Sequence, residues 1–246
     1  MMRPLAILSA VLFAGASPAA SQTLDLGALA GQANGTSVGY IIQLFGLLTV
    51  LSIAPGILIM VTSFTRFVIV FSILRTGIGL PSTPANLILI SLSLFMTFYV
   101  MAPTFDQAWN NGVQPLMNNE IDEAVAVERI AEPFRGFMSA NVRDEDYNLF
   151  ADLAVERGGV QTEAQQADMR VLIPAFMISE IRRGFEIGFL IVLPFLVIDL
   201  IVATITMSMG MMMLPPTVVS LPFKILFFVL IDGWNLLVGS LVRSFA

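Results

Sequence analysis

Four long apolar segments constrain the fold of this 246-residue sequence more than any other feature. They cover roughly residues 40–61, 87–105, 185–207 and 218–242. Each is close to the roughly 20 residues that an α-helix needs to cross a bilayer. Apolar residues make up 57% of the chain and charged residues 12%, whereas a soluble domain usually carries about 25% charged residues. We therefore expect an all-α membrane protein built of helical hairpins, with about four long apolar helices.

The sequence contains no histidine and no cysteine. Their absence excludes Ser-His-Asp and Cys-His catalysis, zinc sites with histidine or thiolate ligands, iron–sulfur clusters and disulfides. No pair of acidic residues has the spacing of an active site, which argues against an intramembrane hydrolase. The glycines also lack the spacing of a phosphate-binding loop. We expect a protein that is not an enzyme and that holds no cofactor and no metal at a histidine or cysteine site.

The first 39 residues differ in character from the apolar segments. Residues 1–21 combine Arg3, a short apolar run and a stretch of small residues, which is the pattern of a secretory signal peptide. Their apolar run is too short to span a bilayer, and an uncleaved anchor is the alternative. Residues 22–39 are rich in Gly, Gln, Asn, Thr and Ser and predict a flexible periplasmic N-terminus.

The negative charge of the chain is concentrated in one segment, since residues 106–170 hold 13 acidic and 5 basic residues. The sequence therefore divides into an N-terminal hairpin (40–105), an acidic periplasmic segment of short helices (106–172) and a C-terminal hairpin (173–246). With the N-terminus outside, Arg66 and Arg75 fall on the cytoplasmic side, as the positive-inside rule prefers. Both ends of the mature chain are then periplasmic.

A methionine-rich loop at residues 207–216 joins the last two apolar segments. Gly210 and the two prolines at 215 and 216 predict that the helix ends here, at the tip of a hairpin. Thioethers are flexible and apolar, which suits either filler between helices or a deformable seal. They are also soft ligands, so a Cu(I) site in a cation transporter is a third interpretation, and the residues alone leave all three open. The methionines concerned are Met209, Met211, Met212 and Met213.

Five of the charged residues in or beside the last two apolar segments are candidates for assembly or buried charge: Glu180, Arg183, Asp199, Lys224 and Asp232. A lone charge inside a membrane is costly, so such residues usually pair. A hairpin around the methionine loop brings Asp199 and Lys224 toward each other, while Lys224 and Asp232, eight residues apart, share roughly one helix face. Glu180 and Arg183 have the spacing of an ion pair on a solvated helix face. We favour a role in assembly over an ion or proton path, because there is no chain of acids and no histidine to relay protons.

Small residues and prolines recur within the apolar segments. Gly184 and Gly188 permit close approach of a neighbouring helix. Pro55, Pro194 and Pro222 predict breaks in regular helices, whose freed carbonyls need partners in neighbouring helices. These features together favour a helical assembly of several subunits.

Several motifs, in this order and spacing, closely resemble the FliP family of type III secretion export-gate proteins. In the C-terminal third they are PAFMISE (174–180), IGF (187–189), PFLVID (194–199), MGMMMLPP (209–216), SLPFK (220–224) and DGW (232–234). The N-terminal half adds TSFTR (62–66), Asn86, LSLF (92–95) and MAP (101–103). The resemblance covers roughly residues 40–246, although residues 106–170 match only as a polar segment and residues 79–85 depart somewhat from the pattern.

The resemblance implies a subunit of the flagellar export gate in the bacterial inner membrane. Members of the family form a ring of copies that joins FliQ and FliR, with FlhB and FlhA as further partners, and unfolded flagellar proteins pass through it. Once assembled, much of the ring sits above the plane of the bilayer. In this family the methionine-rich loop acts as a gasket in the pore, a role that falls here on Met209 and on Met211, Met212 and Met213. The injectisome paralogue is the alternative within the family.

Overall fold

The computed structural model describes residues 37–80, 82–158, 163–164, 168–210 and 215–245. All regular secondary structure in these residues is helical, which confirms the expected all-α class for this part of the chain. Two helices there are long and apolar enough to cross a membrane, or up to four if each bent pair counts as one span. The signal peptide and most of the N-terminal segment predicted from the sequence lie outside the described residues, as do Met211, Met212 and Met213.

The chain divides into two units, residues 1–53 and 54–246, and the division falls inside helix α3, Ser37–Met60. In the second unit a short turn leads from α3 into α4, Phe64–Ile78. Helix α4 ends at Gly79, whose φ of 94° is the left-handed conformation that glycine adopts most readily. Helix α5, Asn86–Ala108, then continues through a π-helical turn, Trp109–Val113, into the single turn of α6, Gln114–Met117.

The acidic segment forms two further helices, α7, Glu123–Asn141, and α8, Asp144–Glu156. Short helices are the structure expected for this segment. The first turn of α8 carries Asp144, Glu145 and Asp146, where carboxylates interact favourably with the helix dipole.

The C-terminal part of the chain departs from the predicted pattern of breaks. Helix α9, Met169–Ser208, runs for 40 residues, about 60 Å, and passes through Pro194 without ending. Helix α10, Pro216–Leu230, likewise continues through Pro222. The predicted breaks at these two prolines are therefore wrong, as is the one at Pro55, which lies inside α3. The break lies instead between α10 and α11, Gly233–Arg243, which meet at 63°.

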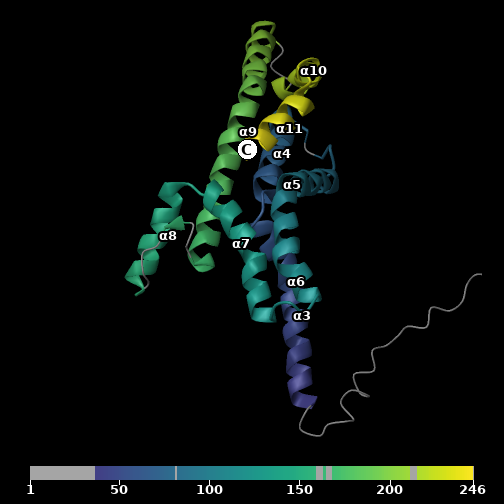
Figure 1. Cartoon of the computed structure of the whole chain (residues 1–246). Helices are drawn as coiled ribbons and strands as arrows, with labels where there is room; N and C mark the ends of the chain where they lie inside the picture. The colour runs from purple at the N-terminus through teal and green to yellow at the C-terminus, as the bar shows by residue number, and fades with distance from the viewer. Residues whose placement is uncertain (1–36, 81, 159–162, 165–167, 211–214, 246) are drawn as a thin grey trace, which may run out of the picture. The chain divides into compact units, whose positions relative to one another are not determined.

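Helices α4 and α9 lie side by side and run in the same direction (Figure 1). Glycines on α9 face isoleucines on α4: a Cβ on Gly188 would come within 2.6 Å of Ile73, and one on Gly184 within 3.0 Å of Ile69. The two glycines thus let the helices approach closely, as their small size predicted. Helix α10 packs against α9 near the end of α9 that leads into the methionine loop.

Two hydrophobic clusters follow one another along the α4–α9 pair. One contains Val61 and Phe176 together with residues of α7 and α8, and the other contains Phe67 and Phe195 together with residues of α10 and α11. Both helices carry a charged residue at the junction of the two clusters, Arg66 on α4 and Glu180 on α9.

Arg66 and Glu180 form a fully buried, two-pronged ion pair. The Arg66 Nε donates to Glu180 Oε2 at 2.8 Å and its Nη2 donates to Glu180 Oε1, and the two side chains are 1% and 0% exposed. The third prong, Nη1, donates to the Ser244 carbonyl oxygen at 3.0 Å, and the Phe245 ring lies 3.6 Å from the guanidinium carbon. One arginine therefore joins α4, α9 and the turn that follows α11.

This contact corrects the membrane topology inferred from the sequence. That topology placed Arg66 at the cytoplasmic end of the first span and Glu180 at the periplasmic entry to the third. The two positions are separated by the roughly 30 Å of a bilayer core, whereas the side chains are in hydrogen-bond contact. The assignment of Arg66 to the opposite side from Glu180 is therefore wrong, because α4 packs along the middle of α9, from Glu180 to Val192.

We predict that Glu180→Gln lowers the free energy of unfolding by about 3 kcal/mol, because it leaves the buried Arg66 charge without a counter-charge. The measurement is denaturant unfolding of the purified chain in detergent. Glu186→Gln is the control, since Glu186 pairs with Arg182 at 3.1 Å on an exposed part of the same helix and should cost less than about 1 kcal/mol. Equal losses in the two variants would contradict the structural importance of the buried pair.

Candidate functional site

The described ends of the methionine loop lie at the tip of the α9–α10 hairpin. Helix α9 ends at Ser208, Gly210 has a φ of +72°, and α10 begins at Pro216. The side chains of Met207 and Met209 are 61% and 68% exposed. The methionines at 211, 212 and 213 lie outside the described residues, so the gasket role of the loop stays a prediction.

A polar cluster next to this loop joins the two helices of the hairpin. The Lys224 Nζ on α10 donates to Asp199 Oδ2 on α9 at 2.5 Å and to the Gly77 carbonyl oxygen at the end of α4 at 3.1 Å. The Ser220 hydroxyl donates to the other carboxylate oxygen of Asp199 at 2.5 Å. Lys224 is 4% exposed, so its charge is neutralised inside the protein rather than by solvent. Asp199 and Lys224 are thus brought together, and the cluster joins three helices.

A groove of about 580 Å³ lies beside this cluster, between α4, α9 and α10. Asp199 and Lys224 line it, together with Ser72, Thr76 and Thr217. The Asp199 side chain keeps 27% of its surface exposed there, so its carboxylate can be reached from the groove.

Three other residues singled out from the sequence have different partners from those expected. Glu180 pairs with Arg66 rather than with Arg183, and it is buried rather than solvated, because α4 covers that face of α9. Arg183 forms no ion pair within the described part of the chain. Asp232 does not share a helix with Lys224, since the chain bends at Asp232, where φ is 53° and Asn235 Nδ2 donates to its carboxylate at 3.1 Å.

The sequence analysis did not identify Arg66 as a residue that forms a buried ion pair. The signal was present, because Arg66 is a cation inside a largely apolar stretch and such a residue usually has a buried partner. What the sequence did not reveal is that its partner lies 114 positions away on α9.

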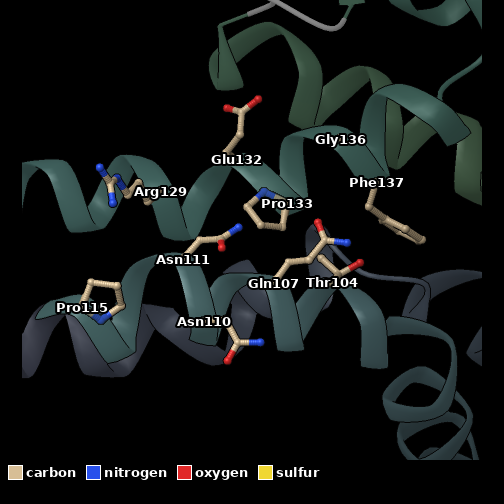
Figure 2. Close-up of a pocket in the computed structure, with 10 residues that line it drawn as sticks. All are labelled: Thr104, Gln107, Asn110, Asn111, Pro115, Arg129, Glu132, Pro133, Gly136 and Phe137. Atoms are coloured by element: carbon tan, nitrogen blue, oxygen red, sulfur yellow. The ribbon is translucent and has the colours of Figure 1, made fainter. Parts of the chain in front are cut away.

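A second cleft, of about 670 Å³, lies between α7 and the stretch from α5 to α6. Figure 2 shows Gln107 and Asn111 between the two helices, whereas Glu132 points away from the helix that carries Asn110. Polar residues, among them Thr104 and Arg129, and apolar residues such as Phe137 both line it. Sequence reasoning did not single out this cleft. Among the described residues no group of three or more Asp, Glu, His or Cys side chains is placed to hold a metal ion.

The sequence matches the FliP family over residues 47–241, a range that contains Arg66, Glu180, Asp199 and Lys224. It is 74% identical over 214 residues to the flagellar biosynthetic protein FliP of Agrobacterium fabrum (strain C58), with 87% of each chain covered. The FliP of Rhizobium meliloti (strain 1021) is 67% identical over 227 residues, which is 92% of this chain and 93% of that one. The FliP of Bacillus subtilis (strain 168) is 48% identical over 209 residues, 85% and 94% of the two chains.

We predict that the Asp199–Lys224 pair shows strong energetic coupling. Asp199→Asn and Lys224→Gln each leave one buried charge unpaired and should lower stability, whereas the double variant removes both charges together. The sum of the two single losses should therefore exceed the loss in the double variant by at least about 1 kcal/mol.

A double-mutant cycle of unfolding in detergent measures this coupling. Combining Asp199→Asn with Glu186→Gln provides the control, because Glu186 lies on the same helix without contacting Asp199, and that pair should be additive. Additivity in the Asp199–Lys224 cycle would mean that the contact contributes nothing to stability.

Proposed function

The chain is a member of the FliP family, and from that premise we propose that it is a pore-forming subunit of the flagellar type III protein export gate. In this proposal several copies form a ring in the bacterial inner membrane that assembles with FliQ and FliR and contacts FlhB and FlhA. Unfolded flagellar proteins cross the membrane through the ring. The subunit acts by shape and packing and carries out no chemical reaction.

The observation that supports a ring most directly is the apolar surface of the α9–α10 hairpin. Large apolar side chains are exposed on several sides of both helices within the described chain. On α9 they include Phe189, Leu190, Leu200 and Ile201, and on α10 Val218, Leu226, Val229 and Leu230. Apolar surface of this extent is covered by lipid or by other protein chains. Neighbouring copies and the partner subunits would supply part of that cover.

The ion pair inside the α9–α10 hairpin supports a rigid subunit in the proposed ring. Lys224 holds α10 against α9 and α4 through Asp199 and the Gly77 carbonyl group. In the proposal, the cluster holds the two helices at the base of the methionine loop. In a ring, every copy would present its loop at the same height.

The physical properties of methionine fit a seal at that height. A pore for unfolded chains has to block ions and small solutes when it is idle, yet accept side chains of every kind during export. A collar of thioether side chains is apolar, so it resists wetting, and it is flexible, so it adapts to what passes. Met209 and Met211, Met212 and Met213 are the residues we assign to this gasket, with the last three as its centre.

The first test is the mass of the purified chain in detergent by native mass spectrometry, alone and co-expressed with FliQ and FliR. We expect a discrete oligomer that recruits both partners. A monomer or dimer under both conditions would contradict the proposal, because no closed pore would exist. Copper binding by that monomer would then favour the metal-transport interpretation of the methionines.

We also predict that Met211→Ala combined with Met212→Ala increases membrane leakage more than it reduces export, since the smaller side chains leave a gap in every copy of the ring. Dye uptake or single-channel conductance measures leakage, and secretion of a flagellar subunit measures export. Met117→Ala is the control, because Met117 is 68% exposed but lies at the end of α6, away from the loop. Leakage equal to that of the control would contradict the gasket.

A further inference from the structure

An apolar cavity of about 230 Å³ lies where the end of α4 and the start of α5 meet α10 and α11. Its wall is made almost wholly of large apolar side chains. The main contributors are Phe71, Leu74, Leu89, Ile225, Phe228 and Val229. Ile225 and Val229 are 41% and 68% exposed, so the cavity opens to the surface of the protein. Exposed apolar surface of this kind is normally covered by lipid or by another protein chain. A cavity of this size and character therefore points to an apolar occupant.

A single cation, Arg75, lines this cavity. Its Nη1 donates to Asn86 Oδ1 and, at 3.5 Å, lies near the Pro84 carbonyl oxygen. Both acceptors are neutral, and within the described residues no carboxylate lies within ion-pair distance of Arg75. The guanidinium is held in place at the cavity, but its charge is not compensated.

Two other cations on the helices around this cavity, Arg66 and Lys224, have a carboxylate partner inside the chain. Arg66, nine residues earlier on the same helix, has Glu180, and Lys224 on α10 has Asp199. Both carboxylates belong to α9. A charge in an apolar layer is costly unless an opposite charge lies nearby, so Arg75 requires an anion from outside the chain.

We propose that this cavity binds one anionic phospholipid, with an acyl chain against the apolar wall and the phosphate on the Arg75 guanidinium. A phospholipid supplies the apolar chain and the anion in one molecule, and a membrane offers it in large excess. Basic pockets between apolar helices are a recognised form of lipid site. Trp234, which also lines the cavity and is 41% exposed, adds the amphipathic ring that favours the level of the lipid headgroups. The bound lipid would fix the α4–α5 turn to the bent α10–α11 pair.

Native mass spectrometry of the delipidated full-length chain, titrated with dioleoyl-phosphatidylglycerol or dioleoyl-phosphatidylcholine, tests this site. We expect one phosphatidylglycerol retained per copy and weaker retention of phosphatidylcholine. Arg75→Gln should reduce the affinity for phosphatidylglycerol about fivefold, the effect typical of one cation near a lipid headgroup. Arg243→Gln is the matched control, because Arg243 is exposed at the end of α11 and lines none of the cavities described above.

A second pair of variants tests the acyl chain separately from the charge. Ile225→Trp fills the cavity from α10, whereas Leu226→Trp adds the same bulk at the neighbouring, exposed position outside it. Ile225→Trp should weaken phosphatidylglycerol binding and Leu226→Trp should not. An excess of inorganic phosphate should fail to displace the lipid, because free phosphate lacks the apolar chain.

Three results would each overturn the proposal: equal retention of the two lipids, equal behaviour of the two arginine variants, or equal behaviour of the two tryptophan variants. Retention of neither lipid would also overturn it. The same spectra report the oligomeric state, so a monomer that keeps its lipid would contradict the ring and leave this site standing.

Discussion

The buried Arg66–Glu180 ion pair is the interaction on which the arrangement of the other helices depends. Taking two charges out of water is costly, and only a geometry with several hydrogen bonds compensates for that cost. Here the guanidinium uses its Nε and Nη2 on Glu180 and its Nη1 on Ser244, while Phe245 covers its face. A small rotation or slide of α4 along α9 would separate these groups and leave two unpaired charges. The pair therefore sets the register of the two helices, and it does so at the junction between the two hydrophobic clusters.

A second charged contact, Lys224 with Asp199, extends this arrangement toward the methionine loop. Asp199 lies 19 positions after Glu180, about 28 Å along α9. The two ties differ in character, since the first joins α4, α9 and the C-terminal turn, and the second joins α4, α9 and α10. Between them, Gly184 and Gly188 keep α4 in close contact with α9. Helices α4 and α9 thus form a packed pair that is held by charged contacts at two levels, at Glu180 and at Asp199. The methionine loop follows the C-terminal end of α9.

The helical class and the approximate positions of the long helices were predictable, because long apolar runs in a chain with so little charge rarely form anything other than apolar α-helices. The hairpin contact of Asp199 with Lys224 followed from the loop between them. The breaks were less predictable, because a proline inside a long helix can be tolerated in a packed helical assembly, and α9 passes through Pro194 without ending. The bend at Asp232 lacks a glycine or proline at the residue itself and depends on a left-handed conformation that sequence patterns do not signal. The partner of Arg66 was hidden for another reason, since long-range pairing depends on tertiary packing and not on local spacing.

The distribution of charge constrains how such a subunit can meet its surroundings. Glu180 and Asp199 on α9 are paired with Arg66 and Lys224 of neighbouring helices, and Glu186 pairs with Arg182 on α9 itself. The exposed flanks of the α9–α10 hairpin are otherwise predominantly apolar. Contacts made by these flanks must then rest on shape and dispersion rather than on ion pairs. Apolar contacts are non-directional and permit small adjustments between neighbours. With paired charges inside each copy and apolar surfaces between copies, the proposed ring would have rigid subunits and interfaces that can adjust.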